Sequence, residues 1–334
     1  MGGCRLSGGG LHLGHYLGCL LPLVNFPDCC QYFFVIRDRP NHGLDRGTDF
    51  HTHDLLAVLA DLMATPFADR ICPVLQSNLF PFYRKLVDAF QTTLTLNQLV
   101  SVHPQKRRLH QWTSTMSVGD LMFPIESACT YFILRAEYVL MNDDNNRFVK
   151  FANRLHSKMC SDNRFASATI PAPHLCHGPL PRLHGFDLRK MSKANMNCIF
   201  LSDSDETLDK RISQLMHFKF LFRQRPDLGE EYARSPIEFH LPDEYPPFEY
   251  LRAFSSEFTN INHEDRLRTL DGQEMLREML RTVIVNNLVR PIRERSTYLR
   301  SHENEVWAWL ESSTENAVKV AARTESLVLA GSSL

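Results

Sequence analysis

The sequence predicts an α/β fold, with a parallel sheet followed by an α-helical domain. Two short apolar runs, residues 32–36 and 71–75, have the composition of strands buried on both faces. A helix expected over residues 52–64 connects them. Strand, helix and strand with short joins form a βαβ unit, which requires parallel strands and a right-handed crossover. The sheet is therefore expected to be Rossmann-like, with ligands beyond the carboxyl ends of its strands.

The elements around this unit are predicted from turns and from apolar spacing. A Ser-Gly-Gly-Gly turn at residues 7–10 precedes a helix that runs to Pro27. Residues 78–160 have a mostly helical pattern, with breaks expected at Pro81, Pro104 and Pro124. Residues 170–183 contain four prolines and are expected to form a loop.

The last third of the chain is predicted to be helical. Apolar residues recur on one face after residue 203, and again at every fourth position from Leu276 until Pro291. Ser312-x-x-Glu315 has the form of a capping box and predicts the start of a final helix that ends near residue 329. We therefore divide the chain into an α/β domain, residues 1–203, and a helical domain, residues 204–334.

Composition excludes several classes of protein. Of 334 residues, 43% are apolar and 22% charged, and the formal net charge is −1, which does not suit a general binder of nucleic-acid phosphates. Nine cysteines without a C-x-x-C pair argue against a disulfide scaffold and a structural zinc site. No run reaches the roughly 18 apolar residues of a membrane span, and the N-terminus lacks the pattern of a secretory signal. We expect a cytoplasmic protein.

The first segment that carries chemistry is His12-Leu13-Gly14-His15, directly after the glycine turn. Two histidines three positions apart at a helix start point the same way, and Gly14 lets a ligand approach the backbone. Free N–H groups at a helix start favour a polyphosphate. By itself, the pair could equally be two partly exposed polar residues.

The second segment is Lys190-Met191-Ser192-Lys193, in a loop. Two lysines flank a serine hydroxyl, and no acid lies beside these donors, so the loop can close over a pyrophosphate leaving group. Alone, the lysines could be solvated loop charge. Both segments in this order, the first in a βαβ context and the second before a helical domain, favour the functional interpretation.

Together the two segments resemble the HIGH and KMSKS signatures of class I aminoacyl-tRNA synthetases. Other segments are similar to the tryptophanyl-tRNA synthetases: residues 75–77, 119–145, 190–203 and 290–295. The resemblance implies an enzyme that uses ATP and Mg²⁺ to convert an amino acid, tryptophan above others, to an aminoacyl adenylate and passes it to tRNA. It also implies a homodimer formed through a helical insert at about residues 78–135.

The resemblance assigns roles to matching positions. His12, His15 and Lys193 would stabilise the transferring phosphoryl group, while Lys190 and Ser192 would hold pyrophosphate with Mg²⁺. The residues expected at ATP are Ser7, Gly8, Gly9, Gly14 and Met191. Those expected at the amino acid are Ser127, Thr130, Asp144 and Asn145.

The amino-acid side departs from the family. Thr130 stands where the family usually has an aspartate that accepts the indole N–H, and an unpaired buried donor costs about 1–3 kcal/mol. Ser127 replaces a methionine or glutamine, and Asn145 replaces a glutamine. One alternative is therefore a paralogue that adenylates another amino acid or passes it to a small amine. Another is a non-catalytic sensor of an amino acid or tRNA, although a pure binder does not need both signatures.

Other charged groups leave two interpretations open. Residues 51–54 read His-Thr-His-Asp, but histidines two apart face different ways on a helix, so we expect a helix start there instead of a metal site. Cys160, Cys176 and His177 could meet at a metal, but we expect none. Residues 106–108, Lys-Arg-Arg, either approach a tRNA acceptor arm or form a solvated surface. Four arginines of the terminal helices either contact a tRNA anticodon or form a solvated surface: Arg290, Arg293, Arg295 and Arg300.

Overall fold

A three-stranded parallel sheet forms the centre of the α/β part. The structure, a computed structural model, describes residues 1–6, 8–38, 52–102, 118–161, 170–180, 183–187, 189–216, 246–254 and 270–329. β1 (Gly2–Arg5) pairs with β2 (Tyr32–Arg37), which pairs with β3 (Ile71–Leu75). The helix α2 (Thr52–Met63) connects β2 to β3, so the predicted βαβ unit is confirmed. The register places Arg5 opposite Arg37 at the carboxyl ends of two neighbouring strands.

A second, two-stranded parallel sheet continues from the first. It consists of β4 (Tyr138–Leu140) and β5 (His174–Cys176). The backbone N–H of Leu140 donates to the carbonyl of Met1 at 2.7 Å, which joins the two sheets edge to edge. The expectation of a continuous loop over residues 170–183 was wrong, because its prolines all lie outside the three residues that pair with β4.

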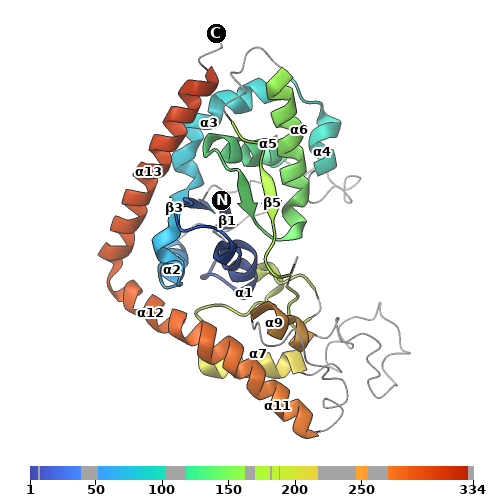
Figure 1. Cartoon of the computed structure of the whole chain (residues 1–334), viewed down its shortest axis with the longest axis vertical. Coiled ribbons are helices and arrows are strands. Elements are labelled where there is room, and N and C mark those ends of the chain that lie inside the picture. Colours follow the sequence, from blue (N-terminus) through green and yellow to red (C-terminus); the bar gives the residue numbers. More distant parts are fainter. Residues whose placement is uncertain are drawn as a thin grey trace, which may run out of the picture.

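Helices cover the sheets on both sides (Figure 1). They are α3 (Gln76–Gln91), α4 (Leu96–Val102), α5 (Val118–Ile133) and α6 (Asn146–Ser161). Pro81 lies inside α3 and Pro124 inside α5, so the breaks expected at these two prolines were wrong. A proline costs a helix one backbone hydrogen bond, and here each helix keeps a buried apolar face that holds it in place. Pro104 lies outside the described residues.

The described residues of the C-terminal third are mostly helical, as predicted. Its elements are α7 (Asp205–Met216), α9 (Pro246–Phe254), α11 (Leu270–Leu280), the π-helical segment η11 (Arg281–Val289), α12 (Arg290–Ser301) and α13 (Glu303–Leu329). Pro291 lies in the first turn of α12 and does not end the helical path. The expected capping box at Ser312 was wrong. α13 begins at Glu303, where two glutamates favour the first turn, and runs through Ser312.

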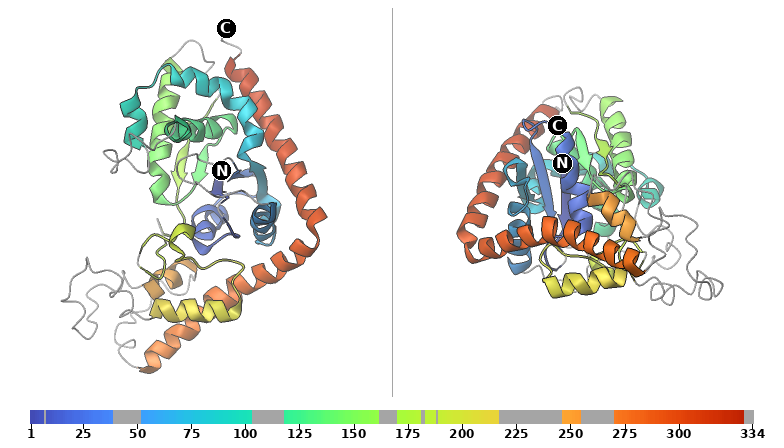
Figure 2. Two further views of the ribbon diagram at one scale, coloured as in Figure 1. Left: turned by 180° about the vertical axis from the view of Figure 1, so that it is seen from behind. Right: turned by 60° about the horizontal axis from the view of Figure 1, so that its bottom comes forward.

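The helices α11, η11 and α12 form a rod that runs back beneath the α/β part (Figures 1 and 2). From its end α13 continues along β3 and α3, and α12 packs on α2. The boundary expected at residue 203 stays a prediction. The structure adds that helices following this boundary pack directly on the elements that hold the glycine turn.

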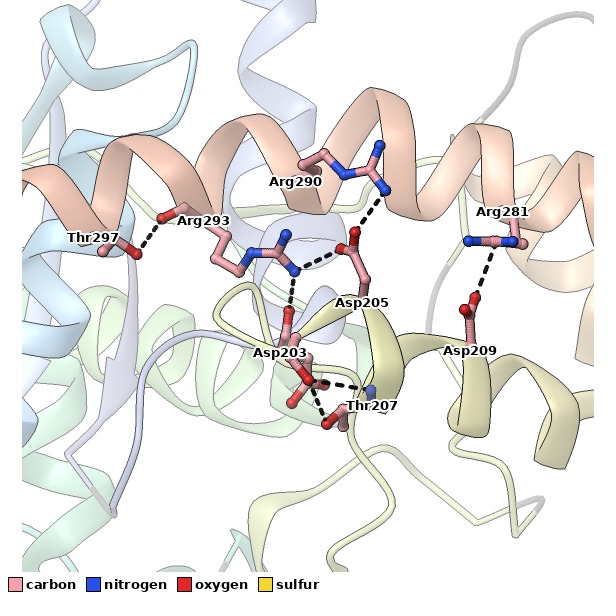
Figure 3. A network of polar contacts seen from close by, with 9 residues as sticks. Asp203, Asp205, Thr207, Asp209, Arg281, Arg290, Arg293 and Thr297 are labelled. Atoms are coloured by element: carbon pink, nitrogen blue, oxygen red, sulfur yellow. Dashed lines mark hydrogen bonds and ion pairs between the residues drawn. The ribbon is translucent and has the colours of Figure 1, made fainter.

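Ion pairs fix the rod to α7 (Figure 3). The carboxylate of Asp205 accepts from Arg290 at 2.7 Å and lies 2.8 Å from Arg293, and these contacts, Arg290 first, lower its pKa. Arg281 lies 3.0 Å from Asp209. Arg290 and Arg293 are thus engaged in ion pairs within the chain, and each side chain stays partly exposed.

The two remaining arginines of this group differ, because Arg300 is half-buried and Arg295 is exposed. Arg300 pairs with Asp61 at 3.0 Å, and the Arg295 guanidinium lies 5.0 Å from the ring centroid of Tyr298. Residues 106–108 lie outside the described residues. All nine cysteines are free thiols. Within the described ranges, every helix is too short or too polar to cross a bilayer.

Candidate active site

The first signature opens the short helix α1 (Leu13–His15), which follows β1 and the glycine turn. The imidazole rings of His12 and His15 stack with their centroids 3.8 Å apart and an interplanar angle of 26°. The prediction that both histidines point the same way is confirmed. A Cβ at Gly14 would lie 3.0 Å from the His12 ring and 3.5 Å from the sulfur of Met191. Glycine is therefore the residue that leaves this approach open.

The second signature lies against the first. Backbone bonds join the start of α1 to the residues that follow the second signature. Leu13 N–H donates to the carbonyl of Ile199, and Leu201 N–H donates to the carbonyl of Leu11, each at 2.9 Å. The Lys193 ammonium donates to the carbonyl of Gly9 at 3.2 Å. The predicted convergence of the histidines and Lys193 on one site is thus present.

A buried asparagine shapes the lysine loop. The side-chain oxygen of Asn197 accepts from Ser192 N–H at 2.8 Å, while its amide donates to Asp187 at 2.6 Å and to the carbonyl of Lys190 at 3.1 Å. Sequence reasoning gave Asn197 no role beyond family resemblance. In the structure Asn197 is buried and directly follows Met196, which has a left-handed backbone conformation with a φ of 49°.

Two aspartates of α2 hold the glycine turn. Asp54 accepts from Gly9 N–H at 3.0 Å, and Asp61 accepts from Leu11 N–H at 2.8 Å. A Cβ at Gly10 would lie 2.0 Å from an Asp61 oxygen, so only glycine fits there. Asp61 was not predicted, because a carboxylate within an apolar helix gives no sign of its partners. Gly8 and Gly9 adopt positive φ, and Ser7 lies outside the described residues.

The site combines positive charge with neutral donors. Burial first, and then the charges of Lys193 and Lys190, lowers the pKa of His12 to about 3. Burial also lowers the pKa of His15 well below its ordinary value, and it lowers the pKa of Lys193. The Nδ1 atom of His12 is buried and has no partner in the described part of the chain. An anion with hydrogen-bonding oxygens would complement this arrangement.

The residues expected at the amino acid lie on two elements. Ser127 and Thr130 are buried on α5 and donate to the carbonyls of Phe123 at 2.9 Å and Glu126 at 2.8 Å. Asn145 ends the turn Asp143–Asn145 and donates weakly to the carbonyl of Asn142 at 3.4 Å. The Asp144 side chain lies outside the described atoms.

Two residues at this end of the site were missed by sequence reasoning. Asn142 donates to the carbonyl of Gly14 at 3.3 Å, which connects the turn to the first signature. Arg37, the last residue of β2, places an Nη atom 3.4 Å from the hydroxyl of Ser127. Its position after a buried strand was the available signal, since ligands bind beyond strand ends in such sheets.

Proteins of similar sequence match nearly the whole chain. The chain is 25% identical to a tryptophan–tRNA ligase of Chlamydia caviae, over 95% of the chain and 90% of that protein. It is 26% identical to that of Treponema pallidum, over 87% of the chain and 84% of that protein. The chain is thus similar to tryptophan–tRNA ligases over nearly its whole length. No family model matches it.

Solved structures agree on the fold. The tryptophanyl-tRNA synthetase of Campylobacter jejuni in complex with ADP and tryptophan superposes with a TM-score of 0.68 at 18% identity, over 97% of this chain and 96% of that one. A tyrosyl-tRNA synthetase of Archaeoglobus fulgidus in complex with L-tyrosine gives 0.61 at 16% identity, over 88% of both chains. The α/β class and the class I synthetase fold predicted from the sequence are confirmed.

The described residues form no ready-made metal cage. Among them, no group of three or more His, Cys, Asp or Glu side chains is placed to hold a metal ion. Cys160 lies beside His156 and His177 beside Asp143, so these two candidates have different neighbours. The donors at the signatures suit phosphate oxygens.

The buried imidazoles of His12 and His15 predict a loss of stability in acid. The unfolded chain has a histidine pKa of about 6.5, whereas burial lowers the pKa of His12 to about 3. Between these values the unfolded state binds more protons, so the free energy of unfolding should fall with decreasing pH, by up to about 1.4 kcal/mol per pH unit for His12. Urea unfolding at pH 7, 6 and 5 measures this slope.

The control for this measurement is a histidine outside the site. His12→Asn should reduce the slope, whereas His53→Asn should retain it, because the His53 ring is exposed on α2. Equal slopes for the wild type and His12→Asn would show that His12 does not enter this linkage.

Proposed function

We propose that this chain is a class I aminoacyl-tRNA ligase. An amino-acid carboxylate oxygen attacks the α-phosphorus of ATP, the bond to the bridging oxygen breaks, and pyrophosphate leaves with that electron pair. The aminoacyl group then passes to tRNA. The observation that carries the proposal is the convergence of the stacked His12 and His15 rings with Lys193 at the glycine turn.

Each group at the signatures has a part in this reaction. Charge builds on phosphate oxygens during the transfer, and preorganised donors stabilise it. His12, His15 and Lys193 would contact the transferring phosphoryl group, and Lys190 and Ser192 would hold pyrophosphate. Bound Mg²⁺ would share the charge of the phosphates. The turn atoms of Ser7, Gly8, Gly9 and Gly14, with the Met191 side chain, would border ATP.

The substrates and partners follow from the family. Tryptophan is the reference amino acid, because the curated relatives are tryptophan–tRNA ligases. Ser127, Thr130, Asp144 and Asn145 would line its side of the site. We further propose tRNA as the acceptor, a homodimer formed through the helices at about residues 78–135, and a cytoplasmic location.

A second candidate is a paralogue that adenylates a different amino acid. The structure favours it at one point: Ser127, on the same helix as Thr130, lies beside a guanidinium. A guanidinium only donates hydrogen bonds, so it does not replace the acceptor that an indole N–H needs.

Amino-acid-dependent ATP–pyrophosphate exchange over all twenty amino acids, followed by charging of total tRNA, tests both candidates. Exchange with tryptophan and charging would support a tryptophan–tRNA ligase. Exchange with another amino acid would support the paralogue. Absence of exchange with every amino acid would contradict adenylation and leave a binding protein.

A further inference from the structure

Arg37 is a cation at the carboxyl end of the central strand, next to the binding helix. Its guanidinium carbon lies 4.7 Å from the centroid of the Phe123 ring, and an Nη atom lies 3.4 Å from the Ser127 hydroxyl. Both partners belong to α5. The side chain therefore extends from the sheet to the helix that carries Ser127 and Thr130, the wall expected to face the amino acid.

The surroundings of Arg37 supply too few acceptors. In the described part of the chain no carboxylate lies within ion-pair distance of its guanidinium; the partners there are one hydroxyl and one aromatic face. Charged groups removed from water are normally paired. The hydroxyl of Tyr131, whose pKa responds to Arg37, is fully buried and has no described partner. Within the described residues, the Arg37 guanidinium therefore has N–H donors without an acceptor.

A second arginine stands beside the first. Arg5 ends β1 directly opposite Arg37 in the parallel register. After burial and Tyr131, the charge of Arg5 is the next largest influence on the pKa of Arg37, and it lowers that pKa. Two cations at neighbouring strand ends make this a position where a negative ligand group is stabilised.

These arginines are distinct from the phosphate-binding groups. The charges that act on the pKa of His12 and His15 are those of Lys190 and Lys193 and, for His15, of His12. Arg37 contacts α5, whereas Lys193 contacts the carbonyl of Gly9 in the glycine turn. The reacting α-carboxylate must lie at the phosphate site to reach the α-phosphorus. The guanidinium on the α5 wall therefore meets the other end of the amino acid.

We infer that the cluster of Arg37, Ser127 and Tyr131 selects an amino acid with an anionic side chain over tryptophan. This inference rests on the proposed adenylation and names its substrate class. Carboxylate and phosphate side chains share the chemistry that a guanidinium recognises in a bidentate manner. The indole of tryptophan has an N–H donor and no acceptor.

The test compares exchange rates across matched amino acids. The panel contains L-aspartate, L-glutamate, L-2-aminoadipate, O-phospho-L-serine, the neutral amides of the first two, and L-tryptophan. We expect one acidic member to exceed tryptophan in kcat/KM by about 100-fold or more. If this member is aspartate or glutamate, it should exceed its own amide by a similar factor. Arg37→Gln should remove that preference while the KM for ATP changes less than twofold. Arg37→Lys should retain part of it.

The matched control is Arg154→Gln. Arg154 lies on α6 with its guanidinium 5.8 Å from the centroid of the Phe151 ring, so it shares the cation–aromatic contact but lies on an exposed surface. This variant should retain the acid-to-amide ratio of the wild type. Thermal unfolding of each variant shows whether it is folded, and the ratio itself does not depend on the amount of active enzyme.

Different results overturn the inference and the proposed function. Exchange with tryptophan and not with any acidic amino acid would overturn the inference and leave adenylation intact. An equal loss for all amino acids in Arg37→Gln would overturn it too. If nothing supports exchange, adenylation fails, and calorimetry of the acidic panel with wild type and Arg37→Gln decides the inference: binding that needs Arg37 supports it, and no binding overturns it.

Discussion

Lys193→Ala should slow amino-acid-dependent ATP–pyrophosphate exchange by about 100- to 1,000-fold, the usual cost of removing one preorganised donor from a developing anion. The Lys193 ammonium is held at the glycine turn by the Gly9 carbonyl at 3.2 Å, and its charge lowers the pKa of both His12 and His15. This bond connects the lysine loop directly to the glycine turn that precedes the first signature.

Binding of the amino acid should survive this change, because Ser127 and Arg37 remain in place. The expected pattern is a loss in kcat with a small change in the KM for the amino acid. Lys210→Ala is the control, since Lys210 is an exposed lysine of α7. Lys193→Arg should recover part of the rate. Exchange at the wild-type rate in Lys193→Ala would show that the phosphoryl group is stabilised by other residues.

The βαβ unit and the ATP side of the site were predictable from the sequence because their signals are local. Residues 32–36 and 71–75 are unbroken apolar runs, and such runs report burial directly. His12 and His15 share a face because of their spacing along the chain. The convergence of these histidines with Lys193 depended on two family signatures, and the structure adds the bonds that produce it.

The parts that were missed depend on contacts between distant segments. Pro81 and Pro124 were expected to break helices, but tertiary packing of a buried face outweighs one lost backbone hydrogen bond. Ser312 had the form of a helix start, yet α13 already begins at Glu303. The partners of Asp61 and Arg37 lie far away in sequence, so no window of residues could reveal them.

Asp61→Asn should lower the free energy of unfolding by about 2–4 kcal/mol, because the amide cannot serve the three donors that surround this carboxylate. Asp61 is 0% exposed. It accepts from Leu11 N–H at 2.8 Å, from the Ser296 hydroxyl at 2.7 Å and from Arg300 at 3.0 Å. An asparagine has one oxygen and would turn its own donors toward at least one of these groups.

The pKa of Asp61 explains why the effect is not larger. Burial raises this pKa, and the bonds from Ser296, Arg300 and Leu11 oppose that rise. The buried Asp61 carboxylate therefore already carries a desolvation cost, which Asp61→Asn removes. The Arg300 side chain is 30% exposed, so water replaces part of the ion pair that this substitution breaks. Urea unfolding with an unchanged m-value measures the difference. Asp69→Asn, at an exposed aspartate, should change the free energy of unfolding by less than about 0.5 kcal/mol.

A double-mutant cycle with Arg300→Gln tests the link between α12 and the glycine turn. If Asp61 joins the two, the effects of Asp61→Asn and Arg300→Gln should be non-additive by about 0.5–3 kcal/mol. Asp61→Asn should also raise the KM for ATP, because Leu11 N–H loses its acceptor beside Gly10, where no side chain fits. Additive effects with an unchanged KM would mean that the rod and the turn are independent. Coupling would mean that α12, a helix far along the chain, helps to set the position of the phosphate-binding turn.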